Sequence, residues 1–300
     1  MKFNNISVIG SSNTDMVIKT SKLPAPGETI LGGDFFMNQG GKGANQAVAA
    51  ARLGGHVSFI TKTGDDVFGQ KARKIFEDEQ INFDHLIVDP VHPSGVALIT
   101  VDAKGENCIV VAPGSNSHLN TEDIEIARDQ VQRSEIVLMQ LEIPIETVVY
   151  AAKMASDAGK KVILNPAPAT KITDELLFML YMITPNESEA GMITGIPVTD
   201  VSSATEAARM LHERGVKVVI VTLGSKGALL YADGEATMVP APKVEAIDTT
   251  AAGDVFNGAI AVAISERMGL KKGVEFACKA AAISVTRMGA QSSAPYRHEL

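Results

Sequence analysis

Apolar runs and amphipathic stretches alternate along most of the chain. Short, nearly continuous apolar runs lie at 6–10, 136–141 and 218–223, and such runs are typical of strands buried on both faces of a sheet. Stretches with helical spacing, such as 41–55 and 145–159, follow them. The same patterns predict further strands at 56–61 and 160–167, further helices at 66–80, 174–180, 202–215 and 254–266, and a strand followed by a helix within 181–195. This alternation predicts an α/β fold with three layers, α/β/α, in which helices cover both faces of a mainly parallel central sheet.

Two segments break this alternation, because no helix separates their strands. Residues 13–36 contain two apolar runs, the second at 29–36, joined by a Pro- and Gly-rich turn at 23–28. Residues 95–113 resemble a hairpin with its turn at 103–106. We expect both segments to form a small, mainly antiparallel sheet that projects as a lid over the active site, over a partner subunit or over both. The alternative is that they are ordinary edge strands of the main sheet.

The chain is therefore divided into a main domain and a lid. The main domain takes residues 1–12, 37–94 and 113–300, and the lid takes residues 13–36 and 95–112. A length of 300 residues suits one large α/β domain with a small appendage.

Composition and charge exclude several classes of partner. The chain is 45% hydrophobic and 21% charged with a net charge of -8, which argues against nucleic acid or an anionic membrane as a partner. Cys108 and Cys278 are far apart and belong to no metal-binding motif, so we expect no disulfide framework or zinc site and a reducing, cytoplasmic location. No run reaches the roughly 18 apolar residues that span a bilayer. Residues 1–10 fit a strand better than a signal peptide.

Three stretches with glycine are candidates for binding phosphate, at 40–46, 222–227 and 248–254, whereas neither GxxxxGK[ST] nor GxGxxG is present. The stretch TLGSKG at 222–227 follows a predicted parallel strand, at the edge where ligands of open α/β sheets bind. Alone, such a stretch is more typical of an ordinary turn than of a nucleotide site.

The stretch DTTAAGD at 248–254 is more specific, because it leads into a predicted helix. Ala251, Ala252 and Gly253 add little bulk around three successive N–H groups, which favours a concave anion site. Asp254 then lies in the first helical turn. The general explanation of an acid there is a favourable interaction with the helix dipole, worth about 0.3–1 kcal/mol.

Taken in order, these motifs resemble those of the ribokinase family of ATP-dependent sugar kinases over nearly the whole chain. The motifs that carry the resemblance are GSSNTD, PGET, GGKGANQAVAAARLG, MQLE, NPAPA, TPNESEA, VTLGSKG, DTTAAGDVFNGA and TRMGAQ. They are closer to the family members that phosphorylate ribose than to fructose or adenosine kinases. The resemblance implies ATP-dependent phosphorylation of D-ribose at its 5-hydroxyl to give D-ribose 5-phosphate and ADP. The alternatives are a kinase for deoxyribose, fructose or adenosine and, more distantly, a sugar or nucleotide sensor without catalytic activity.

The resemblance also implies a role for individual residues. Asp254 corresponds to the family's catalytic base, and the amides of Ala251, Ala252 and Gly253 correspond to its anion hole. The sugar-binding positions that match, besides Asp254, are Asn13, Asp15, Gly40, Gly41, Lys42, Asn45 and Glu142. The ATP-binding positions that match are Asn186, Thr222, Gly224, Ser225, Lys226, Gly227, Gly253, Asp254 and Cys278. Cys278 stands where relatives often have a polar residue near the adenine, which leaves base selectivity open.

Metal ions and a dimer follow from the same resemblance. Glu189 of the NxxE motif is expected to help place Mg²⁺ through water. A monovalent K⁺ ion is expected mostly on backbone carbonyls at Asp248, Thr250, Ser284, Arg287, Gly289 and Ser293. Family members dimerise through the lid, where apolar residues alternate at Val17, Ile18, Ile30, Leu98, Ile99, Ile109 and Val110, so a homodimer is expected.

Overall fold

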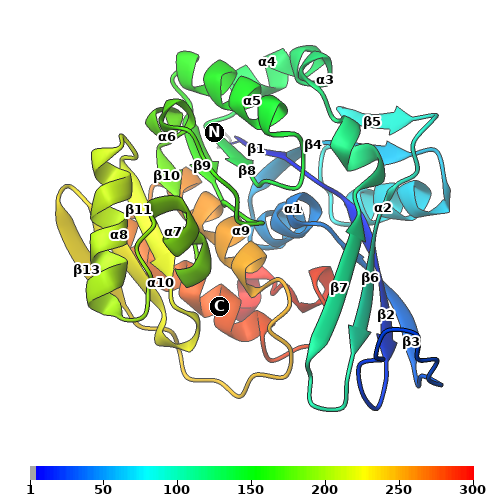
Figure 1. Ribbon diagram of the computed structural model, residues 1–300. Coiled ribbons are helices and arrows are strands. Elements are labelled where there is room, and N and C mark those ends of the chain that lie inside the picture. The colour runs from blue at the N-terminus through cyan, green and yellow to red at the C-terminus, as the bar shows by residue number, and fades with distance from the viewer. Residues whose placement is uncertain (1–4) are drawn as a thin grey trace.

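The computed structural model describes residues 5–300 and contains two sheets of unequal size (Figure 1). Within these residues the main sheet has nine strands in the order β13-β12-β11-β10-β9-β8-β1-β4-β5. Their bounds are β1 Asn5–Ile9, β4 His56–Gly64, β5 Leu86–Asp89, β8 Ile136–Met139, β9 Lys161–Leu164, β10 Met182–Ile183, β11 Val218–Thr222, β12 Ala228–Ala232 and β13 Glu235–Val239. Pairing is parallel from β11 through β5, and β12 and β13 add an antiparallel edge. The expected mainly parallel sheet is confirmed.

Helices cover both faces of this sheet. One face carries α1 Lys42–Arg52, α2 Val67–Asp78, α9 Ala252–Ser265 and α10 Leu270–Ser284. The other carries α3 Thr121–Ile126, α4 Arg128–Arg133, α5 Ile145–Asp157, α6 Asp174–Met179, α7 Glu187–Thr194 and α8 Val201–Glu213. Successive strand residues point to opposite faces, so Ile136 and Leu138 of β8 join the first core and Val137 and Met139 join the second. This double burial explains why the strands are almost continuously apolar.

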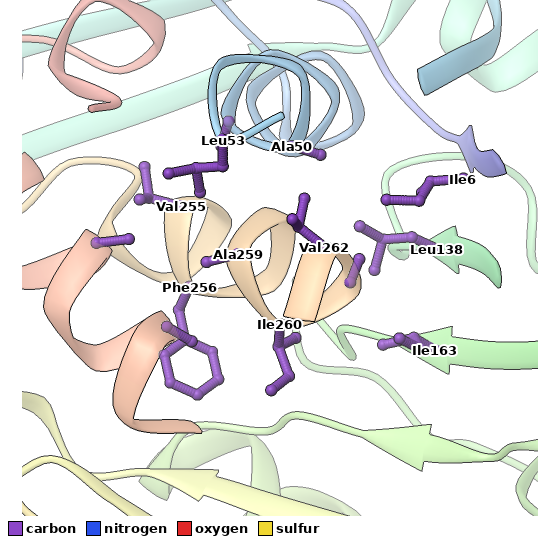
Figure 2. Packing of buried hydrophobic residues seen from close by; sticks show 14 of the residues in the cluster. Ile6, Ala50, Leu53, Leu138, Ile163, Val255, Phe256, Ala259, Ile260 and Val262 are labelled. Carbon is purple, nitrogen blue, oxygen red and sulfur yellow. The ribbon is translucent and has the colours of Figure 1, made fainter. Parts of the chain in front are cut away.

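Helix α9 is the most deeply buried helix of the first face, because every residue from Asp254 to Ser265 is buried. Its apolar side chains point toward α1, toward the sheet and toward α10 (Figure 2). It crosses α1 at Gly258, where an added Cβ would lie 2.8 Å from both the Ala49 Cβ and the Gln46 carbonyl oxygen. This close crossing holds the start of α1 against the start of α9.

The lid is a separate sheet of four strands in the order β3-β2-β6-β7, with β2 Asn13–Lys19, β3 Phe35–Gly40, β6 Gly95–Val101 and β7 Asn107–Ala112. It projects away from the main body (Figure 1). The β2–β6 pair is parallel and the other two pairs are antiparallel, so the expected small, mainly antiparallel sheet is confirmed.

One strand of the lid lies later in the chain than expected. The second run of the first lid segment was expected to pair at 29–36, but the strand is Phe35–Gly40 and residues 29–34 are irregular. The register explains the difference, since β2 pairs residue by residue from Asn13 with Gly40 to Ile18 with Phe35. Pairing therefore carries the lid sheet past residue 36, into the stretch that had been assigned to the main domain. Among residues 5–300, no helix is long and apolar enough to cross a membrane.

Candidate functional site

The strand order reverses at the carboxyl ends of β1 and β8, and we call the edge of the sheet at this point the crevice. The chain proceeds from β1 to β4 on one side, whereas β8 pairs with β1 on the other. Ligands of open α/β sheets bind at such a switch point. Asn13 follows β1 and Glu142 follows β8, and α1 begins at the same edge with Lys42. The sheet order therefore gathers residues that are more than a hundred positions apart.

Glu142 connects the end of β8 to the start of α1. Its Oε2 accepts hydrogen bonds from the Ser11 hydroxyl at 2.5 Å and from the Lys42 amide at 3.0 Å. The Ser11 hydroxyl in turn accepts from the Gly43 amide at 3.3 Å. Because α1 has no side-chain cap from its own Ncap residue, Glu142 satisfies one of its free amides. Glu142 thus shapes the crevice, and Ser11, which sequence analysis did not single out, is its partner.

Asn13 and Asp15 occupy the opening of the crevice beside the lid. The Asn13 Oδ1 accepts from the Asn116 Nδ2 at 2.7 Å, and the Asn116 Oδ1 accepts from the Ser12 amide at 2.9 Å. Asn116 was missed, because its stretch, a short 3₁₀ helix at Gly114–His118, carries no motif. Gly40 leaves room for the Asp15 carboxyl group, since a Cβ there would lie 2.2 Å from the Asp15 Oδ2.

The crevice holds several carboxylates around one lysine. Burial, followed by the charges of Glu142 and Asp254, raises the pKa of Asp15 to about 6, against a lowering by Lys42. Burial alone would lower the pKa of the Lys42 ammonium, but Asp254, Glu142 and the other nearby carboxylates raise it above its ordinary value. Lys42 therefore stays charged and offsets the surrounding negative charge.

Asp254 lies at the floor of the crevice and is 6% exposed. Its Oδ2 accepts from the Asn45 Nδ2 and its Oδ1 accepts from the Gln46 Nε2, both at 2.9 Å. Burial raises the pKa of Asp254, while Lys42 and the two amides oppose that change. In the described part of the chain, no Lys or Arg nitrogen comes within 4.0 Å of its carboxylate. Each oxygen keeps a lone pair for a further donor.

Asn45 carries a second signal of a ligand. Its Oδ1 is buried and has no hydrogen-bond partner among residues 5–300. A buried acceptor without a donor is unfavourable by about 1–3 kcal/mol. A hydroxyl group between Asn45 and Asp254 would satisfy this oxygen.

The turn before α9 presents free amides. Among the described residues, no acceptor is found for the Ala251 and Gly253 N–H groups, whereas the Ala252 amide makes a long bond of 3.3 Å to the Thr249 carbonyl. Ala251 has a φ of 59°, a left-handed conformation that is strained for a residue with a Cβ. Free amides at the start of a helix attract anions. Two of the three amides expected to form the anion hole are thus unpaired.

A cavity of about 770 Å³ lies on the other side of this turn. Seven of the residues expected at the nucleotide line it, namely Asn186, Thr222, Gly224, Ser225, Gly227, Gly253 and Cys278. Lys226 is not among them, although its ammonium group lies 3.9 Å from the carboxylate of Glu187, which does line the cavity. Asp254 does not line the cavity either, since its carboxylate faces the crevice. Burial raises the pKa of the Cys278 thiol to about 11, so the thiol is neutral in the wall.

Most of the other lining residues were not predicted. Eight of them come from the loop after β13 and from the face and end of α10, namely Ala241, Pro242, Lys243, Val244, Ala246, Ala281, Ala282 and Val285. Apart from Lys243, these eight residues are small or apolar, and they have no distinctive spacing. Only the small side chains of α10 could have indicated a helix that faces a cavity.

Asn186 and Glu189 form a capping box at the start of α7. The Asn186 Oδ1 accepts from the Glu189 amide at 2.8 Å, and the Glu189 Oε2 accepts from the Asn186 amide at 2.9 Å. Burial raises the pKa of Glu189, which lies within electrostatic range of Lys42 and Asp254. The box has a structural role, yet it leaves the second carboxylate oxygen of Glu189 free.

Of the residues expected around a monovalent cation, Asp248, Thr250 and Gly289 lie together beside the start of α9, whereas the hydroxyls of Ser284 and Ser293 bond only to carbonyls of their own turns. The Asp248 Oδ1 accepts from the Thr250 amide at 2.9 Å, and its Oδ2 accepts from the Gly289 amide at 2.8 Å. The Arg287 side chain is paired with Glu299, with one N–O distance of 3.3 Å. Backbone carbonyls of these loops are therefore the groups left to bind an ion. No cluster of three His, Cys, Asp or Glu side chains suited to a metal is found within residues 5–300.

The fold and the crevice place the protein among the enzymes that transfer phosphoryl groups to sugars. The chain belongs to the pfkB family of carbohydrate kinases, which it matches over residues 4–297, and this confirms the family that the motifs indicated. The chain is 45% identical to the ribokinase of Haemophilus influenzae over 294 residues, which is 98% of this chain and 96% of that protein. It is 39% identical to the deoxyribokinase of Salmonella typhi over 296 residues, which is 97% of this chain and 95% of that protein.

A solved structure extends this similarity to the arrangement of the chain. The ribokinase of Arabidopsis thaliana in complex with ribose and ATP superposes with a TM-score of 0.91 at 34% identity, covering 99% of this chain and 97% of that one. The two chains therefore share one fold over nearly their whole lengths.

Proposed function

We propose that this protein transfers the γ-phosphoryl group of ATP to the 5-hydroxyl of D-ribose, giving D-ribose 5-phosphate and ADP. The observation that carries the proposal is the first turn of α9. Its Asp254 carboxylate faces the crevice, while its Gly253 backbone lines the neighbouring cavity. A base for the acceptor and donors for the migrating group thus lie on one rigid turn, as an in-line transfer requires.

Asp254 takes the proton of the sugar hydroxyl as the oxygen attacks the γ-phosphorus. The raised pKa of Asp254, caused by burial, makes it a better proton acceptor than an exposed aspartate. The free amides of Ala251 and Gly253 donate hydrogen bonds to the phosphoryl oxygens as charge develops. ADP then leaves from the cavity beside α10.

The crevice suits a small polyol. The Asp15 and Glu142 carboxylates accept from hydroxyl groups, and the unpaired Asn45 Oδ1 accepts from another. A sugar without one of these hydroxyls would leave a buried acceptor unpaired. The similarity to a deoxyribokinase keeps 2-deoxyribose as the second candidate acceptor, and fructose and adenosine follow it.

Magnesium and potassium ions fit the residues around the nucleotide cavity. Mg²⁺ keeps several waters and binds few protein carboxylates, so the free oxygen of Glu189 together with ATP phosphates suits it. When bound, it neutralises charge on the phosphates. The carbonyl-rich loops at Asp248 and Gly289 suit K⁺, which would support the turn before α9.

The lid suits a homodimer. Of its seven expected interface residues, Ile18, Leu98, Ile109 and Val110 are exposed, Ile30 and Ile99 are half-buried, and Val17 is buried. Phe35 and Met37 add to the exposed set. The strand register places Ile18, Phe35, Met37, Leu98 and Val110 on one face of the lid sheet and Ile109 on the other. An exposed apolar face of this kind marks an interaction site. We propose that a second copy of the lid covers this surface.

A cytoplasmic location stays a prediction from cysteine usage.

An assay of the purified protein with ATP and a panel of sugars tests the proposed function. We expect D-ribose to have the highest kcat/KM, with the new phosphate at its 5-position by phosphorus NMR. The Asp254→Asn variant should keep its fold by circular dichroism and lose at least about 100-fold in kcat. The exposed Asp129→Asn variant on α4 is the matched control and should turn over normally. Near-normal turnover by Asp254→Asn would overturn the proposal, and a preference for 2-deoxyribose would change its substrate.

A further inference from the structure

Buried side-chain amides lie behind Asp254, and the mechanism above does not use them. Gln46, on α1, is 0% exposed. Its Nε2 donates to the Asp254 Oδ1 at 2.9 Å and to the Asn165 Oδ1 at 3.1 Å, and its Oε1 accepts from the Gln140 Nε2 at 2.6 Å. Gln46 therefore joins the acid to the ends of β8 and β9 through three hydrogen bonds.

Only one orientation of the Gln46 amide satisfies these partners. Turning it over would point its Oε1 at the Asp254 and Asn165 oxygens and its Nε2 at the Gln140 nitrogen. The Asp254 and Asn165 oxygens therefore set the direction of the Gln46 amide. Gln140 adds a donor to the Gln46 Oε1, although it does not touch Asp254, and its own Oε1 lies buried beside the Gly10 backbone without a hydrogen-bond partner among residues 5–300.

The same set of side chains returns to the backbone next to the acid. The Asn165 Nδ2 donates to the Thr184 carbonyl at 3.3 Å, and the Thr184 hydroxyl donates to the Asn257 Oδ1 at 2.6 Å. The Asn257 Nδ2 then donates to the Gly253 carbonyl at 2.8 Å. All of these side chains are buried. The circuit ties the carboxylate and the peptide preceding it to the same strand ends.

We propose that Gln46 is a positioning residue for phosphoryl transfer, which fixes the Asp254 carboxylate in the rotamer that aims Oδ2 at the sugar hydroxyl. Asn45 contacts the other oxygen and also faces the sugar, whereas Gln46 contacts the acid from behind. This inference rests on the proposed role of Asp254 as the base. It separates two neighbouring residues of one motif into a ligand-binding residue and a positioning residue.

Loss of Gln46 should have a signature in the pH profile of kcat. The Gln46 donor stabilises the ionised form of Asp254, so its removal raises the pKa of the acid. The other charged groups that face Asp254 are Lys42, Glu142, Asp15 and Glu189. A Gln46 variant leaves these four charged groups in place, so a shift in the acid limb of the kcat pH profile would be caused by loss of the amide.

Gln46→Met is the first variant, because methionine has a similar length and no donor. We expect kcat for ribose to fall about 10- to 100-fold, since small misplacements of reacting groups have effects of this size. The KM for ribose should stay within about twofold, and the acid limb of kcat should move about one pH unit upward. An unchanged acid limb and unchanged kcat in a folded variant would overturn the inference.

Gln140→Met provides a second variant that keeps the test valid if Gln46→Met does not fold. It removes the donor to the Gln46 Oε1 and so holds Gln46 less firmly, and the acid limb should therefore move in the same direction by a smaller amount. Gln130→Met, on α4, is a control that should behave as wild type. If Asp254→Asn turns over normally, the proposed base is wrong. If Asp254→Asn is inactive but both glutamine variants keep the wild-type limb and kcat, only the positioning role is wrong.

Discussion

The crossing of α1 and α9 and the lid differ in how completely the chain buries their side chains. At the crossing, every residue from Gly43 to Ala50 on α1 is buried, and so is α9 from Asp254 onward. In the lid, every residue of β7 is exposed, and Leu98 and Phe35 are more than half exposed. Folding of the single chain buries the first region, whereas the second keeps apolar surface exposed to a partner outside the chain.

This difference assigns different tasks to the two regions. Transfer of a phosphoryl group requires a base and an anion site held within fractions of an ångström, and only a tightly packed core provides that precision. Binding of the sugar and association with another subunit require surface that the chain itself leaves exposed. The sugar crevice lies between the two, because Asn45 comes from the crossing and Asp15 comes from the lid.

Gly258→Ala should produce the largest change in stability and test the crossing directly. In an ordinary helix this substitution stabilises by roughly 0.5–1 kcal/mol. Here the new Cβ would lie 2.8 Å from the Ala49 Cβ and the Gln46 carbonyl oxygen, so we expect a loss of about 1–3 kcal/mol instead. Chemical denaturation measures the free energy of unfolding, and kcat should fall as the two helices move apart.

Gly191→Ala on α7 is the matched control for the predicted loss of stability. Its Cβ would meet the Ile196 carbonyl oxygen at 3.4 Å, which is ordinary contact, so the substitution should be neutral or stabilising. If both variants gain stability, the crossing has more room than its geometry indicates, and the contrast with the lid is weakened.

The pH dependence of ribose binding sharpens the comparison at the lid edge of the crevice. Asp15 accepts hydroxyl donors best when ionised, and its pKa is raised to about 6 by burial and by Glu142 and Asp254. The KM for ribose should therefore rise as the pH falls through about 6, by roughly tenfold, because hydrogen bonds to a charged group contribute about 1.5–3 kcal/mol. Asp15→Asn should have a high KM that no longer changes over this range.

The same pKa predicts a stability change of opposite sign. The folded protein binds the Asp15 proton more tightly than the unfolded chain, for which the pKa is 3.8. The free energy of unfolding contributed by this group is therefore largest below pH 3.8 and declines as the pH rises through about 6. A KM that is independent of pH between 5 and 7 in the wild type would show that Asp15 does not contact the sugar.

The sequence predicted the parts of the fold that depend on local pattern, and it missed parts that depend on pairing. Apolar runs located β8 and β11, and the breaks in alternation located the lid. The apolar residues at 30 and 31 favoured a strand, yet pairing with β2 placed β3 later, at Phe35–Gly40. Local pattern cannot show which partner a strand has.

The candidate site divides in the same way. Asp254 and the residues at 40–45 were indicated by motifs, since their neighbours in sequence carry the signal. Asn116 lay outside every motif, and Ser11 and Gln140 stood inside motifs without a predicted role, because each acts on a residue about a hundred positions away. Their contacts exist only once the strand order has brought β1 beside β8. Gln46 stood inside a motif, but its role beside Asp254 became visible only from the buried hydrogen bonds.

Val110→Lys in β7 should change assembly with the smallest effect on stability, below about 0.5 kcal/mol for a surface substitution. Val110 is 62% exposed in the single chain, so a lysine there meets water unless a second copy covers it. Light scattering at micromolar concentration should show a dimer for the wild type and a monomer for the variant, because burying two unpaired charges is unfavourable. Ile126→Lys, at an equally exposed site on α3, is the control and should leave the dimer intact. A wild-type monomer, or a variant that still dimerises, would mean that a second copy does not cover Val110 on this face of the lid.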